Sequence, residues 1–177
     1  MMPTHDPLDI IEIPLSKTKM ALMLAGSALF VAAGIWFLSN SGRFHANHVL
    51  IMAVGIAAIV FFGVIALYIV SKLFDTRPGF IVDNDGITDN SSMFAVGFVP
   101  WEDVLGFDVV NVANQRIIMI LVKDPDGYIH RQPNALARRT ASMNYRSYGS
   151  PVAVTANALK TKFDDLYRLM KERRPNL

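Results

Sequence analysis

Two uncharged, apolar stretches decide the fold of this chain. Residues 20–38 read MALMLAGSALFVAAGIWFL, and residues 49–71 read VLIMAVGIAAIVFFGVIALYIVS. At a rise of about 1.5 Å per helical residue they reach roughly 28 and 34 Å, whereas the hydrocarbon core of a bilayer is about 30 Å thick. The pattern predicts a hairpin of two transmembrane helices. The alternative, a buried hairpin in a soluble protein, is disfavoured because two charge-free stretches lie side by side.

The excess of apolar residues is confined to this hairpin. Between residues 20 and 71, 38 of 52 residues are hydrophobic, against 54 of the other 125. The whole chain is 52% hydrophobic and 18% charged, whereas soluble domains average about 45–50% apolar and about 25% charged residues. We therefore expect an N-terminal segment at 1–19, a membrane block at 20–71 and a globular domain at 72–177.

Basic residues beside the spans predict the orientation. Four of them lie on the terminal sides of the hairpin: Lys17, Lys19, Lys72 and Arg77. The connecting loop, residues 39–48, carries only Arg43. Because Lys and Arg are enriched in cytoplasmic loops, we expect a protein that crosses the cytoplasmic (inner) membrane twice, with both termini in the cytoplasm. Neither span holds an Asp, Glu, Lys or Arg, which disfavours a transporter or channel.

Small residues recur in both spans, where they let helix backbones approach closely. They are Ala21, Ala25, Gly26, Gly34, Ala53, Gly55, Ala57 and Gly63. We expect the two spans to pack against each other. Self-association through the same small-residue faces is the alternative.

After residue 71 the pattern changes to short β-prone segments separated by turns. Strands are expected at 80–82, from 87, and at 93–99, 101–112, 116–123, 128–131 and 152–155. An amphipathic helix over 161–174 ends the chain. Residues 8–15 alternate imperfectly between apolar and polar, which predicts either an added edge strand or a disordered tail. Together these patterns suggest a mainly β, α+β domain: about seven antiparallel strands in a small barrel capped by the C-terminal helix.

The order of these segments resembles a known family. The resemblance is carried by IPLSK at 13–17, KLFD at 72–75, PGFIVD at 78–83, GI at 86–87, WEDV at 101–104 and GSPV at 149–152. The chain resembles an uncharacterised family of small bacterial membrane proteins with two N-terminal transmembrane helices and a C-terminal pleckstrin-homology-like (PH-like) domain. The resemblance implies a PH-like fold on the cytoplasmic side. PH domains that bind inositol lipids use basic residues in the first hairpin, whereas the corresponding turn here carries Asp83, Asp85 and Asp89.

Motifs for catalysis are missing from the sequence. The chain has no cysteine, no phosphate-binding Gly-rich loop, no Gly-x-Ser-x-Gly elbow and no zinc-protease helix. We therefore expect a non-enzymatic protein with no cofactor, no bound metal and no nucleic-acid partner.

Charge is segregated along the domain, and the basic part contains the candidate site. Residues 72–126 hold four basic and nine acidic groups, whereas residues 127–177 hold ten basic and three acidic ones. Four arginines fall in a stretch without any acid, residues 130–148: Arg131, Arg138, Arg139 and Arg146. Arginine forks match phosphate geometry, and each charge near an anionic leaflet gains about 1 kcal/mol. The stretch is either a lipid- or phosphate-binding site or a solvated loop.

Two functions therefore follow from the sequence. The leading hypothesis is a membrane protein whose cytoplasmic PH-like domain binds a protein partner or scaffolds an assembly. The alternative is a domain that senses or binds anionic lipid headgroups of the bilayer through the Arg-rich stretch, residues 131–146.

Overall fold

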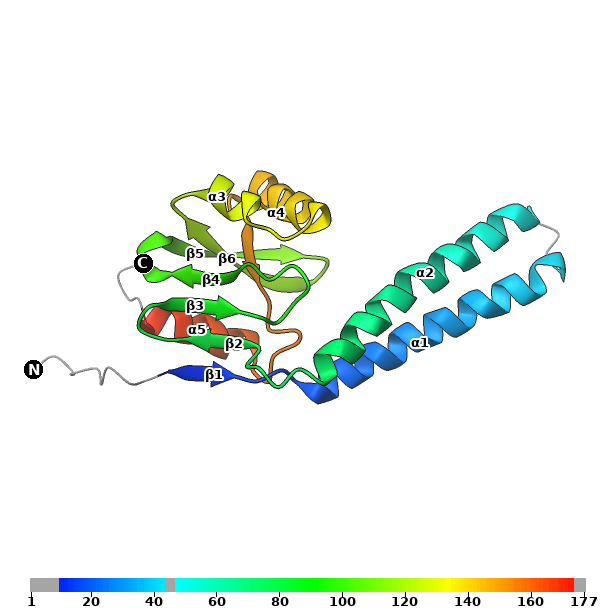
Figure 1. The fold of residues 1–177 in the computed structure, drawn as a ribbon, viewed down its shortest axis with the longest axis horizontal. Coiled ribbons are helices and arrows are strands. Elements are labelled where there is room, and N and C mark those ends of the chain that lie inside the picture. The colour runs from blue at the N-terminus through cyan, green and yellow to red at the C-terminus, as the bar shows by residue number, and fades with distance from the viewer. Residues whose placement is uncertain (1–9, 44–46, 174–177) are drawn as a thin grey trace, which may run out of the picture. The chain divides into compact units, whose positions relative to one another are not determined.

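A computed structural model describes residues 10–43 and 47–173 (Figure 1). The chain divides into two compact units. One is a helical unit, Lys17–Thr76, and the other combines Met1–Ser16 with Arg77–Leu177 and is called here the sheet domain. The helical unit therefore interrupts the sheet domain in sequence.

The helical unit contains the two long helices that the apolar stretches predict. They are α1 (Lys17–Asn40) and α2 (His48–Leu73), and a short 3-10 helix, η1 (Ser41–Arg43), follows α1. Both helices are long and apolar enough to cross a membrane. Only 11% and 6% of their most apolar windows is buried. Their apolar side chains therefore face outward, unlike those of a core helix in a soluble protein.

Two glycines allow α1 and α2 to approach each other. A Cβ atom on Gly34 would lie 2.9 Å from the carbonyl oxygen of Gly55, and one on Gly55 would lie 3.0 Å from that of Gly34. Nearby, the rings of Phe30 and Phe62 stack with centroids 4.2 Å apart. Small residues thus serve packing within the hairpin at this point, as close helix contacts require.

The sheet domain contains two antiparallel sheets and a C-terminal helix. Sheet 1 has the order β1 (Ile11–Ile13), β2 (Phe80–Val82), β3 (Gly86–Asp89) and β4 (Gly97–Pro100). Sheet 2 has the order β5 (Val104–Val112), β6 (Gln115–Val122) and β7 (Val152–Val154), and α5 (Phe163–Arg173) ends the described chain. The strand number and the C-terminal helix agree with the sequence-based expectation. Within the described residues the two sheets do not close, so the expected small barrel is not seen.

The core of the sheet domain joins both sheets to α5. Phe80 and Ile87 from sheet 1, residues 118–120 from sheet 2, and Leu166 and Met170 from α5 are all fully buried. Leu166 and Met170 are four residues apart, so they lie on one face of α5. This face covers the core, and the solvent-facing side of α5 carries its charged residues.

β1 and β2 are neighbours in the sheet although the whole helical unit separates them in the chain. They pair antiparallel, with Ile13 opposite Phe80. The backbone N–H of Gly79 also donates to the carbonyl of Ile13 (2.9 Å). Residues 11–13 thus form an edge strand, while residues 8 and 9 of the alternating segment lie outside the described residues. The helical unit is the connection of the first β-hairpin.

The acidic turn joins β2 to β3 within sheet 1. Asp83 closes the turn between β2 and β3, because its Oδ1 accepts the backbone N–H groups of Asp85 (2.9 Å) and Gly86 (2.8 Å). It is the second connection of sheet 1, not the first. Its correspondence to the first hairpin of PH domains, which the resemblance implies, stays a prediction.

The expected strand at 128–131 is wrong, because these residues form the end of a helix and its C-terminal cap. Residues 125–130 form α3 (Pro125–His130), with Pro125 in its first turn. The Asp124 side chain caps α3 by accepting the N–H of Gly127 (2.9 Å). Proline at a helix start and an Asp cap both favour helix over strand.

Most of the Arg-rich stretch, residues 135–148, is a helix and not a loop. It forms α4 (Ala135–Tyr148), which begins after the cap residue Asn134 and ends at Gly149 with a left-handed φ of 76°. α3 and α4 lie side by side, and α4 also contacts β7 (Figure 1). The expected strand at 93–99 is shorter than predicted and occupies only β4, Gly97–Pro100.

Candidate interaction site

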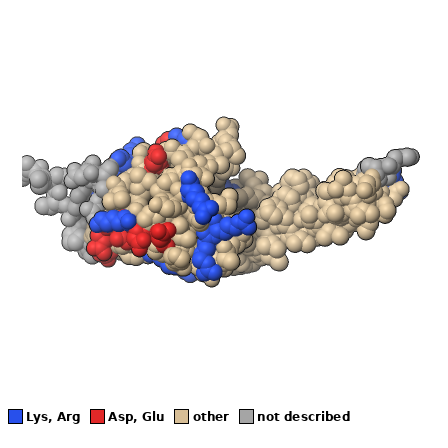
Figure 2. Space-filling model, turned by 90° about the horizontal axis from the view of Figure 1, so that it is seen from above, with Lys and Arg blue, Asp and Glu red and all other residues tan. Residues whose placement is uncertain are grey.

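The four candidate arginines do not share one environment. Arg131 caps the C-terminal end of α3, whereas Arg138, Arg139 and Arg146 lie on α4. All four side chains are exposed. Figure 2 shows one group of Lys and Arg side chains on the sheet domain standing clear of acidic residues, with Asp and Glu side chains gathered on another part of the same face.

Arg131 is engaged by the domain itself. Its Nη2 donates to the backbone carbonyl of Phe98 on β4 (2.6 Å), and its Cζ lies 3.7 Å from the centroid of the Tyr128 ring. The Tyr128 hydroxyl donates to Asp103 Oδ2 (2.8 Å). Burial raises the pKa of Tyr128 to about 12, and the hydrogen bond to Asp103 adds to this rise. Arg131 therefore joins α3 to sheet 1.

The three arginines of α4 do not all lie on one face of the helix. Arg138 Nη1 lies 3.4 Å from the carbonyl of Gln132, a long hydrogen bond. Arg139 and Arg146 are seven residues apart and so lie on the same face. Neither of these two side chains forms an ion pair or a hydrogen bond with another of the described residues. These two are the arginines most available to a ligand.

The exposed face of α4 alternates between apolar and basic residues. Leu136, Arg139, Met143 and Arg146 follow a spacing of three, four and three, which places them on one face. Leu136 is 60% and Met143 59% exposed, whereas Ala137 and Ala141 on the opposite side are buried. No sequence-based prediction includes these two apolar residues, because no helix is predicted over this stretch. The cap residues Asn134 and Gly149 are the signals in the sequence from which this helix could be predicted.

A second candidate is the free edge of sheet 2, strand β5. β5 is nine residues long and pairs only with β6 among the described strands. It contains no Pro, Lys or Arg, which are the residues that usually protect an edge strand. Five of its six apolar side chains are not buried: Leu105, Phe107, Val109, Val110 and Val112.

The other sheet edges are short or covered. β1 and β7 are three residues long. β4 ends at Pro100, and Arg131 occupies the carbonyl of Phe98 on this strand. β5 is therefore the sheet edge in the described chain that is best able to accept another strand.

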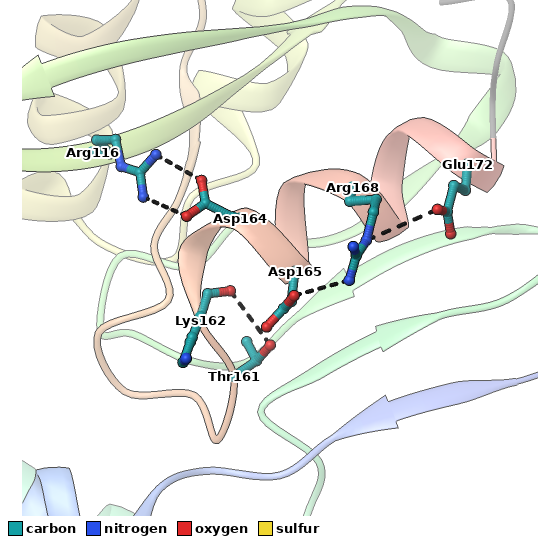
Figure 3. A network of polar contacts seen from close by, with 7 residues as sticks. All are labelled: Arg116, Thr161, Lys162, Asp164, Asp165, Arg168 and Glu172. Atoms are coloured by element: carbon teal, nitrogen blue, oxygen red, sulfur yellow. Dashed lines mark hydrogen bonds and ion pairs between the residues drawn. The ribbon is translucent and has the colours of Figure 1, made fainter.

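A polar network fastens α5 to the β5–β6 hairpin (Figure 3). Arg116 on β6 makes two hydrogen bonds to Asp164, Nη1–Oδ1 at 2.7 Å and Nη2–Oδ2 at 3.0 Å, and its Cζ lies 4.2 Å from the Phe163 ring centroid. On α5 itself, Arg168 pairs with Asp165 (2.9 Å). The hydrogen bonds from Arg116 hold the pKa of Asp164 below its ordinary value of 3.8. The contribution of this pair to stability is present above that value and is lost as the pH falls below it.

Side chains suited to a metal ion do not cluster in the part of the chain that the structure describes. No three His, Cys, Asp or Glu residues come together there in a way that could hold a metal ion. Comparison of the chain with protein families, with curated proteins and with solved structures finds no match. The two candidate surfaces are the exposed face of α4 and the free edge of β5.

Proposed function

We propose that this chain is a non-enzymatic protein of the cytoplasmic membrane that presents a PH-like domain to a protein partner. The two apolar, outward-facing helices support membrane insertion. The basic residues on their terminal sides, such as Lys17 and Lys72, support a cytoplasmic location for the domain. A four-stranded sheet, a three-stranded sheet and a C-terminal helix that covers the core support the PH-like class.

The observation that carries this function is the open edge of β5. An unpaired strand edge presents a row of N–H and C=O groups that can bind an extended segment of another protein. On β5 these groups are flanked by half-exposed Phe107, Val109 and Val110. The partner that fits is an extended, apolar protein segment that adds a strand to sheet 2. The nearly charge-free edge, with Asp108 as its one charged residue, favours an uncharged segment.

A photo-crosslinking experiment tests this edge. Benzoylphenylalanine replaces Val110 on β5 or, as a matched control, Thr88 on the interior strand β3, in the full chain in native membranes. We expect one discrete adduct from Val110 and none from Thr88. The substitution Val109→Lys, which puts a charge on the edge, is expected to abolish the adduct. No adduct, or an adduct of twice the mass of the chain, would contradict binding of a separate partner at β5.

A labelling experiment tests the orientation. The chain has no cysteine, so single-cysteine variants carry no background. Ser41→Cys, after α1, and Asp85→Cys, in the β2–β3 turn, are treated with a membrane-impermeant maleimide on intact spheroplasts. We expect labelling at Ser41 and protection at Asp85 until the membrane is opened. The reverse pattern would overturn the cytoplasmic location of the domain.

The exposed face of α4 favours a second function, binding of anionic lipid. Its alternation of Leu136 and Met143 with Arg139 and Arg146 is typical of helices that lie on a membrane surface. The assay uses an environment-sensitive dye on Met143→Cys in nanodiscs with or without phosphatidylserine. Salt-sensitive burial of the dye that is lost in Arg139→Gln/Arg146→Gln supports this function. Identical spectra in both lipids count against it.

A further inference from the structure

One end of the sheet domain carries both connections to the helical unit and two exposed apolar side chains. The chain leaves sheet 1 after Ile13 and returns at Phe80, and these residues are opposite each other. The loop between β3 and β4, residues 90–96, lies at the same end. In this loop Met93 is 39% and Phe94 40% exposed.

Backbone contacts fix the position of this loop. Asp89, the last residue of β3, is opposite Phe80. The backbone N–H of Asn90 then donates to the carbonyl of Gly79 (2.9 Å). Asp89 Oδ1 accepts the N–H of Ser91 (2.8 Å), which holds the start of the loop. Met93 and Phe94 therefore lie on a loop that begins beside the point where the chain returns from α2.

Two basic residues, Arg77 and Lys160, lie at the same end. The backbone N–H of Lys160 donates to the carbonyl of Pro14 (2.9 Å), and that of Ser16 donates to the carbonyl of Ala158 (2.7 Å). The side chains of Lys160 and of Arg77, the first residue after the helical unit, are exposed. This end thus combines apolar side chains with positive charge.

The opposite end of sheet 1 is acidic. The exposed Asp85 and the half-buried Asp83 lie in the β2–β3 turn, which is at the far end of the strands. The backbone N–H of Trp101 donates to the carbonyl of Asp85 (3.0 Å), which brings the exposed Glu102 to this end as well. The exposed acids Asp85 and Glu102 therefore lie away from the connections to α1 and α2, whereas Asp89 at the connection end is buried.

The connections between sheet 1 and the helices α1 and α2 are short. Four residue steps separate Ile13 from Lys17, and seven separate Leu73 from Phe80. At about 3.5 Å per residue these connections span at most about 14 and about 25 Å. If α1 and α2 cross a bilayer, the end of sheet 1 lies within reach of the lipid headgroups.

We propose that the β3–β4 loop inserts Met93 and Phe94 into the headgroup region of the bilayer, with Lys160 and Arg77 beside anionic headgroups. Large apolar side chains beside basic ones are what interfacial binding uses. Two side chains are too small a surface for a protein partner, since specific protein interfaces bury about 800 Å² per partner. This inference rests on membrane insertion of the two helices and is independent of the β5 edge.

Fluorescence quenching by lipid tests the insertion of the loop. The full chain, one copy per nanodisc, carries a nitrobenzoxadiazole dye on Met93→Cys, and shallow spin-labelled lipids act as quencher. The matched control is Asp85→Cys at the acidic end, and a second control is Leu67→Cys, an exposed position of α2 (73% exposed). We expect quenching at Met93 several-fold stronger than at Asp85.

The possible outcomes distinguish insertion of the β3–β4 loop from insertion of the two helices. Strong quenching at Leu67 with equal, weak quenching at Met93 and Asp85 would overturn loop insertion and leave the membrane helices intact. Weak quenching at Leu67 would refute membrane insertion itself, and the loop proposal with it. A blue-shifted but unquenched dye at Met93 would mean that protein covers the loop, which also overturns the proposal. With the dye moved to Ser92→Cys, Phe94→Asp should reduce the quenching and Phe98→Asp on β4 should not.

Discussion

Shortening Ile13 to alanine tests whether β1 belongs to the sheet domain. Ile13 is 8% exposed and lies opposite Phe80, which is fully buried. The substitution removes three methyl or methylene groups, and each contributes about 0.8 kcal/mol when buried. The lost burial of these groups alone therefore lowers the free energy of unfolding by about 2 kcal/mol. With the cavity left beside Phe80, the free energy of unfolding falls by about 2–4 kcal/mol.

The assay follows unfolding of the sheet domain within the full chain. Replacing Trp36 of α1 by Phe leaves Trp101 as the single tryptophan. Trp101 is 6% exposed, and its Nε1 donates to the carbonyl of Asp83 (2.8 Å), so its fluorescence reports on the folded domain. Urea titrations in detergent micelles then compare Ile13→Ala with Ile10→Ala, a substitution of the same kind at a position that is 60% exposed.

The comparison has a clear negative outcome. Ile10→Ala is expected to change the free energy of unfolding by less than about 0.5 kcal/mol, as surface substitutions usually do. A loss for Ile13→Ala that is no larger than for Ile10→Ala would show that β1 does not pack in the sheet. The helical unit would then precede the domain and not interrupt it.

Three further predictions concern the strands and α3. Gly86→Ala should destabilise the domain by more than about 2 kcal/mol in the same urea assay, because a Cβ there would press against the carbonyl of Val99. Ala113→Gly should stabilise it by about 0.5–1 kcal/mol, because Ala113 holds a left-handed φ of 48° in the β5–β6 turn. The raised pKa of Tyr128 predicts a contribution to stability that is present below pH 10 and lost as the pH rises toward about 12. Urea midpoints at about pH 9 and about pH 11.5 should therefore differ less for Tyr128→Phe, which cannot donate to Asp103, than for the natural chain.

Elements with strong local signals could be predicted from the sequence. The two apolar helices, the long strands β5 and β6, and α5 all lie where hydrophobic periodicity places them. α3 could not be found by this rule because Tyr128 and Ile129 are β-prone. Asp124 and Pro125 instead start a helix. Here the capping residues decided the structure against the side-chain propensities that follow them.

The candidate site depended on contacts between residues far apart in the chain. Arg131 looked like a ligand-binding arginine, but Phe98, the residue whose carbonyl it binds, is 33 positions away. Nothing local in the sequence indicates this contact. The open edge of β5 was equally hidden, because the order of strands in a sheet follows from tertiary pairing and not from the pattern within each strand.

β1 precedes α1 in the chain but pairs with β2 and belongs to the sheet domain. A fragment that begins after α2 lacks β1, so it exposes the edge of β2 and removes Leu15, which forms an isolated bridge with the buried Leu159. Such a fragment is not the intact domain. If α1 and α2 cross a bilayer, two short connections at one end of sheet 1 give that end a high effective concentration at the bilayer. Under the proposed insertion, weak contacts between the small β3–β4 loop and lipid would then form in a large fraction of molecules, whereas the same loop on a free domain would bind lipid too weakly to be detected.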